Sequence, residues 1–126
     1  ERARAGLERV LSRDRSAAAV RARAQWLIGE TFFLQQDYVQ AIDAYRRVEA
    51  IEPAGIWVAV SLIQAGKSIE QLGRTRDAVV CYGALVNQFA DSHHAGLARQ
   101  RLAALGHDGR SPDPATRGPS DKTLRR

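Results

Sequence analysis

Apolar residues recur at the spacing of an amphipathic helix in five successive stretches of the chain, and this spacing predicts an all-α fold. The stretches lie within residues 20–32, 38–48, 56–69, 78–89 and 95–105. Sustained period-two alternation is absent, so we expect no strand. In each stretch the apolar stripe is expected to be the buried face. The stripe of the first stretch consists of Val20, Ala24, Leu27, Ile28 and Phe32, and that of the third of Ile56, Ala59, Leu62, Ile63, Gly66 and Ile69.

The two ends of the chain have their own patterns. Leu7, Val10 and Leu11 predict a sixth, shorter helix at the start. Ser92 is placed to cap the last helix and Gly106 to end it. Residues 106–126 hold three of the four prolines and few large apolar residues, so we expect a disordered tail.

Two of the predicted helical hairpins are copies of each other. Gly29 and Gly66, Ala41 and Ala78, and Tyr45 and Tyr82 are each separated by 37 residues. The small residues are expected to let the paired helices approach closely, and the aromatic residues to fill the space beside them. One hairpin cannot bury its own apolar face, so we expect the units to stack.

These residues resemble the tetratricopeptide repeat family. The first unit supplies Gly29, Phe32, Ala41, Tyr45 and Pro53, and the second supplies Leu62, Gly66, Gly73, Ala78 and Tyr82. The second unit departs from the family pattern at Ile69 and Ala90. The long period is similar to that of bacterial cell-envelope proteins, of the Tol-Pal accessory and outer-membrane assembly lipoprotein type. That likeness implies a periplasmic or envelope location, while a cytoplasmic one stays open.

The resemblance divides the chain into five parts. We expect residues 1–21 to form an N-terminal helix that is the remnant of a preceding repeat. Residues 22–55 and 56–92 are the two repeats, residues 93–105 a capping helix, and residues 106–126 the tail. On this division the chain is a piece of a larger multi-repeat protein.

The resemblance also implies a function. The first helices of such hairpins line a concave groove that binds a peptide or a partner protein. The groove positions fall on Arg23, Trp26, Glu30, Phe33, Lys67, Glu70 and Gln71, with Leu34, Val60 and Ile63 beside them. Trp26 and Phe33 lie two helical turns apart, which suits an apolar side chain of a partner. Both residues fit a core position as well, and the sequence does not decide between the two.

Charge changes this interpretation little. The net charge is +5, but residues 1–23 hold +4, residues 24–105 hold −1 and residues 106–126 hold +2. A nucleic-acid-binding domain usually carries its basic residues on the folded face, so nucleic acid is not an expected partner. Two alternatives to groove binding stay open: a structural or self-associating solenoid segment, and basic termini that contact nucleic acid or anionic lipid. The longest apolar run is Ile56–Val60, too short for a transmembrane segment.

Catalytic candidates are few. His93 and His94 are adjacent, so on a helix they point about 100° apart and have no third metal ligand nearby. Cys81 lies within an apolar helical stretch and is expected to be a buried thiol. We therefore expect no enzyme, no metal, no cofactor and no small-molecule substrate. The oligomeric state and the identity of the partner cannot be derived from the sequence.

Overall fold

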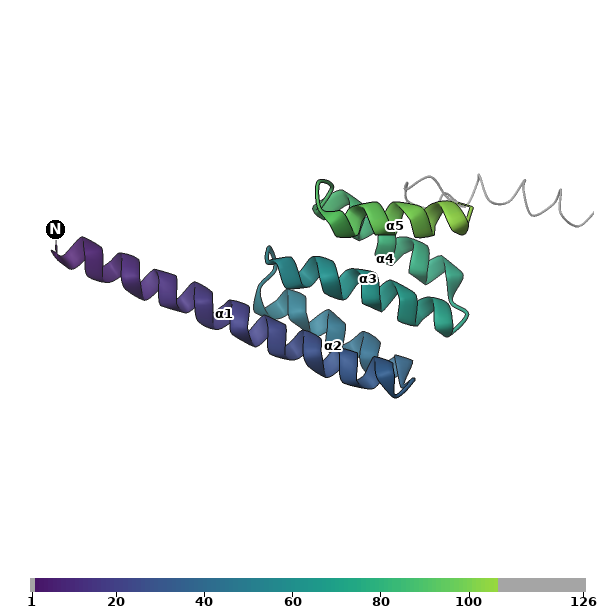
Figure 1. Cartoon of the computed structure of the whole chain (residues 1–126), viewed down its shortest axis with the longest axis horizontal. Helices are drawn as coiled ribbons and strands as arrows, with labels where there is room; N and C mark the ends of the chain where they lie inside the picture. Colours follow the sequence, from purple (N-terminus) through teal and green to yellow (C-terminus); the bar gives the residue numbers. More distant parts are fainter. Residues whose placement is uncertain (1, 107–126) are drawn as a thin grey trace, which may run out of the picture.

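The computed structural model describes the backbone of residues 2–106 and the side chains of residues 15–106, and it contains five helices over this range. They are α1 (Arg2–Leu34), α2 (Tyr38–Ile51), α3 (Ile56–Gln71), α4 (Thr75–Gln88) and α5 (His93–Ala104). Figure 1 shows two antiparallel hairpins, α1 with α2 and α3 with α4, followed by α5. The predicted all-α helical-repeat fold is confirmed. The expected tail lies outside the described residues, apart from Gly106.

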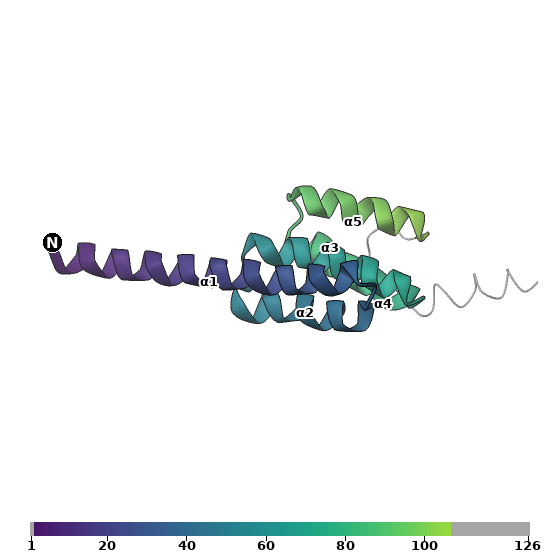
Figure 2. The ribbon, with the colours of Figure 1, turned by 60° about the horizontal axis from the view of Figure 1, so that its bottom comes forward.

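The helices form two layers. The first helices of successive units pack directly on one another, α1 on α3 and α3 on α5, while α2 fills the angle between α1 and α3 (Figures 1 and 2). Within residues 2–106, the second helices α2 and α4 make no close backbone contact with each other. One layer is therefore continuous, whereas the other is open between its two helices.

Each hairpin is closed by a tyrosine that lies against a glycine. A Cβ atom at Gly29 would lie 2.5 Å from Cδ1 of Tyr45, and one at Gly66 would lie 2.3 Å from Cε1 of Tyr82. Both tyrosines are buried. The predicted role of these glycines is confirmed: only a residue without a side chain leaves room for the ring of the paired helix.

The turn inside each hairpin is repeated as well. Gln36 and Gly73, 37 residues apart, both have a positive φ, 62° and 76°. In the first turn the amide of Asp37 donates to the carbonyl of Phe32, and in the second the amide of Arg74 donates to that of Ile69. This pairing ends α1 and α3 in the same way. Glycine adopts a positive φ at little cost and glutamine does not, so the first turn is the more strained of the two.

The last helix begins and ends where the sequence predicts. The side chain of Ser92 accepts a hydrogen bond from the amide of Ala95 at 3.0 Å. Gly106 has a φ of 85° just after the last turn. Ala98 and Leu102 of α5 are buried against the core of the second hairpin. Helix α5 therefore covers α3 and α4 at this end of the stack.

The start of the chain differs from the prediction. We expected residues 1–21 to form a helix of their own, but a single helix runs from Arg2 to Leu34. The reason is that residues 7–28 contain neither glycine nor proline, and alanine is frequent among them, so nothing ends the helix there. The assignment of residues 1–21 to a preceding repeat stays a prediction.

The buried face of α1 also differs from the prediction. Val20, Ala24, Leu27 and Ile28 were expected to face the core but are exposed, with Val20 68% and Ile28 48% accessible. The side that packs carries Ala22 and Gly29, which are buried. Because these two residues are small, α2 and α3 approach α1 on that side, and close approach outweighs side-chain hydrophobicity. Ile56 is likewise 72% exposed rather than buried.

Candidate functional site

The exposed sides of α1 and α3 in the continuous layer form the surface closest to the predicted groove. We call it the first-helix face, and its positions correspond between the two units at the 37-residue offset. It consists of Arg23, Leu27, Glu30 and Leu34 of α1 and Val60, Gln64, Lys67 and Gln71 of α3, with Ile56 at the start of α3. Leu34 and Ile56 are its most exposed large apolar residues, at 80% and 72%.

The seven predicted site residues do not share one environment. Arg23, Lys67 and Gln71 are exposed on the first-helix face, whereas the other four are half-buried. Binding of a partner by these seven residues stays a prediction.

Trp26 lies in the junction between α1 and α3. Its ring centroid is 5.1 Å from that of Trp57, at an interplanar angle of 35°. The guanidinium of Arg23 lies 6.0 Å from the centroid of Trp57, at the outer limit of a cation–π contact. The Nε1 atom of Trp26 is buried and has no hydrogen-bond partner among the described residues. Trp26 is thus mainly a packing residue that joins the two units.

Phe33 packs inside the first hairpin. Its ring meets that of Tyr38 edge-on, with the centroids 5.6 Å apart. It also lies against the cluster formed by Ala41, Tyr45 and Ala65. These contacts favour the core alternative for Phe33.

Two carboxylates join consecutive units in the same manner. Glu30 accepts hydrogen bonds from the Tyr45 hydroxyl at 2.7 Å and from Nε2 of Gln64 at 2.8 Å. Glu70 accepts one from the Tyr82 hydroxyl and pairs with the guanidinium of Arg101, whose Nε lies 3.0 Å from Oε2. Each carboxylate therefore binds the tyrosine of its own hairpin and a donor from the next first helix.

The bridges differ in charge. Burial raises the pKa of Glu70, but hydrogen bonds from Arg101 and Tyr82 outweigh burial and hold the pKa below its usual 4.5. Burial and the neighbouring carboxylate raise the pKa of Tyr45 and of Tyr82, so both hydroxyls stay protonated and remain donors. Arg23 and Lys67 are the exposed charged side chains of the first-helix face, whereas Glu30 on the same face is half-buried.

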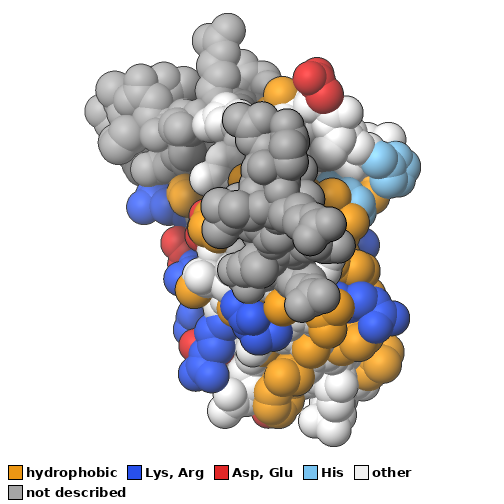
Figure 3. Space-filling model, turned by 90° about the vertical axis from the view of Figure 1, so that its left-hand side faces the viewer, with side chains coloured by type: hydrophobic (Ala, Val, Ile, Leu, Met, Phe, Trp, Pro, Cys, Tyr) orange, Lys and Arg blue, Asp and Glu red, His pale blue; other side chains and the backbone are white. Residues whose placement is uncertain are grey.

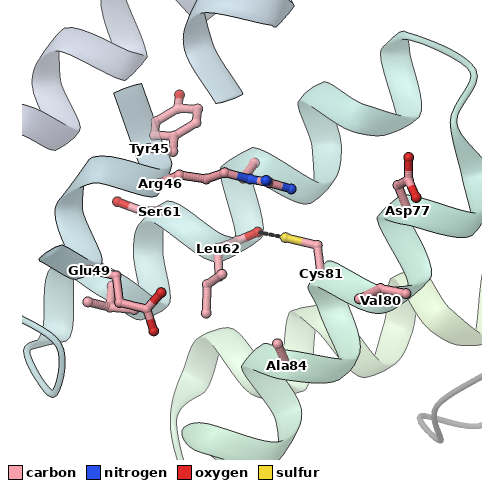
Figure 4. Close-up of a pocket in the computed structure, with 11 residues that line it drawn as sticks. Tyr45, Arg46, Glu49, Ser61, Leu62, Asp77, Val80, Cys81 and Ala84 are labelled. Atoms are coloured by element: carbon pink, nitrogen blue, oxygen red, sulfur yellow. Dashed lines mark hydrogen bonds between the residues drawn. The ribbon is translucent and has the colours of Figure 1, made fainter. Parts of the chain in front are cut away.

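A pocket of about 340 Å³ lies on the opposite side of α3, in the opening between α2 and α4. Figure 4 shows Arg46 and Glu49 entering it from α2, and Asp77, Val80, Cys81 and Ala84 from α4. Leu62 and Ser61 of α3 lie between them. The pocket therefore has small and apolar residues along its floor and charged side chains at its rim.

Cys81 in this pocket is poorly suited to act as a nucleophile. Its Sγ atom donates to the carbonyl oxygen of Leu62 at 3.3 Å (Figure 4). Burial raises the pKa of the thiol to about 11, with a smaller opposing effect from Arg46. The thiolate is the reactive form, so near neutral pH this cysteine is almost wholly unreactive.

Other chemical candidates are equally limited. The rings of His93 and His94 meet edge-on at 5.7 Å, and burial together with His93 lowers the pKa of His94. Among the residues that the structure describes, no group of three or more His, Cys, Asp or Glu side chains could hold a metal ion. No helix within the described range combines the length and apolar character needed to cross a membrane.

Two features of these surfaces were missed in the sequence. Leu27 and Ile56 were assigned to buried stripes. The small residues Gly29 and Gly66 mark the packed face of each helix, and turning that face toward the core would have left Leu27 and Ile56 on the exposed face. The pocket was missed because it depends on the angle between hairpins. Its only sequence signal is the group of small residues that line it, namely Ser61, Ala65, Cys81 and Ala84.

Comparison with known proteins supports the repeat. Residues 23–53 match the model of the Tetratricopeptide repeat family. Comparison with curated proteins found no match. The matched segment runs from the packed half of α1 through α2 to Pro53, which is the first hairpin. The family match and the five-helix architecture together describe a helical-repeat protein similar to tetratricopeptide repeat proteins.

Proposed function

We propose that this chain is a protein-interaction module that binds a segment of a partner protein across the first-helix face. Tetratricopeptide repeats generally mediate protein–protein interactions and are typically not enzymes. The observation that carries the proposal is the exposure of Leu34 and Ile56, at 80% and 72%, on a face that also holds exposed cations. Leu34 ends α1 and Ile56 begins α3, so the two lie at opposite ends of the face, and a segment that contacts both must lie along the length of the helices.

Charge indicates the kind of segment that fits. Glu30 and Glu70 are held by their bridges, while Arg23 and Lys67 are exposed. A segment with apolar side chains for Leu34 and Ile56 and carboxylates for the two cations would satisfy this face. Trp26 and Phe33 support the surface from below, because they fix α1 against α3 and α2.

Selection from a random peptide display library tests the proposal. Enriched peptides should combine acidic and apolar residues, and their binding should fall at least about tenfold on Ile56→Glu or Lys67→Glu, because each change places a negative charge against the ligand. Val39→Glu is the matched control, since Val39 is 60% exposed on α2, away from the first-helix face. Failure to enrich any peptide, or equal loss in all three variants, would refute the proposal.

A further inference from the structure

The side of α1 that faces away from α3 carries a second apolar surface, which borders the first-helix face. It consists of Val20, Ala24, Ile28 and Thr31, one above another on successive turns, and all four are exposed. We call it the α1 outer face. Figure 3 shows hydrophobic side chains gathered beside basic ones toward the end of the molecule opposite the histidines of α5.

The same positions in the second unit are covered. The residues 37 positions later are Trp57, Ser61, Ala65 and Ser68. Three of them are buried and Trp57 is half-buried. Ala65 packs with Ala41 and Tyr45 of α2, and Val58 beside Trp57 packs with Val48 of α2. In the second unit, therefore, an α-helix covers this face.

The face on α1 is more apolar than its covered counterpart. Ile28 takes the place of Ala65, and Ala24 takes the place of Ser61. A face that is more apolar than a buried one, yet exposed to water, gains more from being covered. The repeat geometry indicates which element would cover this face, namely a helix packed along α1 in the way that α2 packs along α3.

The charges beside the α1 outer face indicate the charge of the helix that would cover it. Arg21 lies three residues from Ala24 and Arg23 three residues from Val20, so these two exposed arginines flank the face. Residues 15–29 contain no aspartate or glutamate. A second copy of α1 would bring the same arginines against these two, which like-charge repulsion disfavours. A helix with acidic flanks would pair with them.

We propose that the α1 outer face docks an acidic amphipathic helix of a partner protein. The helix places its apolar stripe on Val20, Ala24 and Ile28 and its carboxylates beside Arg21 and Arg23. The site borders the first-helix face along Arg23 and Leu27, so the variants that test it are placed at residues that belong to one face alone.

Two matched synthetic peptides test the docking. Both carry three heptads with alanine and leucine at the apolar positions; the outward positions are glutamate in one and lysine in the other. Fluorescence anisotropy of the labelled peptide, titrated with the whole chain, measures binding. We expect saturable binding of the glutamate peptide, at least about tenfold weaker binding of the lysine peptide, and a marked weakening of the former between low and high salt.

Three variants locate the site. Ile28→Glu and Arg21→Glu should each weaken the glutamate peptide by about tenfold or more, because they place a negative charge in the interface. Because the first-helix face also favours acidic, apolar segments, Ile56→Glu tells the two sites apart. Loss of the glutamate peptide on Ile56→Glu but not on Ile28→Glu would place it on the first-helix face and overturn the docking. Circular dichroism of each variant, with an unchanged spectrum expected, verifies that the fold is kept.

Other occupants give distinct results. Light scattering that detects a dimer of the chain, lost on Ile28→Glu, would mean that a second copy covers the face and would overturn the proposal. Stronger peptide binding after removal of residues 107–126 would mean that the tail occupies it, and this also contradicts the proposal. Absence of saturable binding, or equal binding of both peptides, overturns it too.

Discussion

Helices α1 and α3 begin equivalent hairpins, yet the same side of each meets a different environment. In α3 the positions of Ser61, Ala65 and Ser68 are buried under the preceding unit, whereas Ala24, Ile28 and Thr31 of α1 face solvent. The side turned toward the paired helix is the same in both, with a glycine against a tyrosine ring. Each repeat thus has an inner packing, between its own two helices, and an outer packing, between its first helix and a helix of the adjacent unit.

The largest effect is expected from a substitution that disrupts the outer packing of α3. Ala65→Glu places a carboxylate in the cluster with Ala41 and Tyr45 and should lower the free energy of unfolding by about 3 kcal/mol or more. Ile28→Glu, the same change at the equivalent exposed position, should alter it by no more than about 0.5 kcal/mol. Urea unfolding followed by circular dichroism measures both, and similar losses would mean that the α1 outer face is covered in solution.

A smaller effect concerns the inner packing, which the two units share. Gly29→Ala and Gly66→Ala should each cost about 1–3 kcal/mol, because the new methyl group collides with the ring of Tyr45 or Tyr82. Gly83→Ala is the control: it lies within α4 with no atom within 4 Å of the added Cβ, so it should stabilise by about 0.5–1 kcal/mol. Thermal melts of the three variants provide the test. Stabilisation by Gly66→Ala would contradict the close approach.

The bridge formed by Glu70 should make the stability of the chain depend on pH, which denaturant unfolding at several pH values measures. The pKa of Glu70 lies below 4.5 in the folded chain, so the unfolded chain binds the proton more tightly. Its contribution to stability is therefore complete above about pH 5 and is lost as the pH falls through the folded pKa. Glu70→Gln should flatten the acid side of the stability curve and cost about 1 kcal/mol near neutral pH, since Arg101 is partly exposed.

Glu30→Gln is the counterpart in the first unit. Its donors, Tyr45 and Gln64, are uncharged. A glutamine at this position can still accept a hydrogen bond through its side-chain oxygen, so we expect Glu30→Gln to lower the free energy of unfolding by no more than about 1 kcal/mol at neutral pH. Urea unfolding at neutral pH measures this, and a larger loss than that of Glu70→Gln would mean that the bridge with uncharged donors is the stronger of the two.

The smallest effect is expected from a substitution that places at a position in α3 the residue found at the equivalent position in α1. Ser61 is 2% exposed and its Oγ atom has no hydrogen-bond partner among the described residues. Ser61→Ala, which gives α3 the residue of Ala24, should raise the free energy of unfolding by zero to about 1 kcal/mol. Ser68→Ala is the contrast, because the Ser68 hydroxyl donates to the carbonyl of Gln64 at 2.9 Å. A clear loss on Ser61→Ala would show that its hydroxyl is satisfied in solution.

The sequence predicted the inner packing well and the outer packing poorly, for a physical reason. Gly29, Tyr45 and the terminating Gly106 act within one hairpin or one helix end, so local spacing reveals them. The orientation of α1 depends on which of its two apolar sides meets another helix. A count of hydrophobic residues favours Val20 and Ile28, while the packing surface is selected by the small size of Ala22 and Gly29.

The candidate site was predicted only in outline. Arg23, Lys67 and Gln71, which the family resemblance places in the groove, are exposed in the structure. The burial of Trp26 depends on Trp57, which is 31 residues away and belongs to the next unit. The opening between α2 and α4 depends on the tilt between hairpins, which no pattern of single residues encodes.

The neighbour-only packing of the five helices also has a kinetic consequence. Every pair of helices in contact within residues 2–106 is one or two places apart in the chain, so all contacts close short loops. Chains of low contact order fold rapidly, and linear arrays open from their ends. Amide hydrogen exchange should therefore be slowest in α3, which contacts all four of the other helices, and faster toward α1 and α5. A helix that docked on α1 would slow exchange there first.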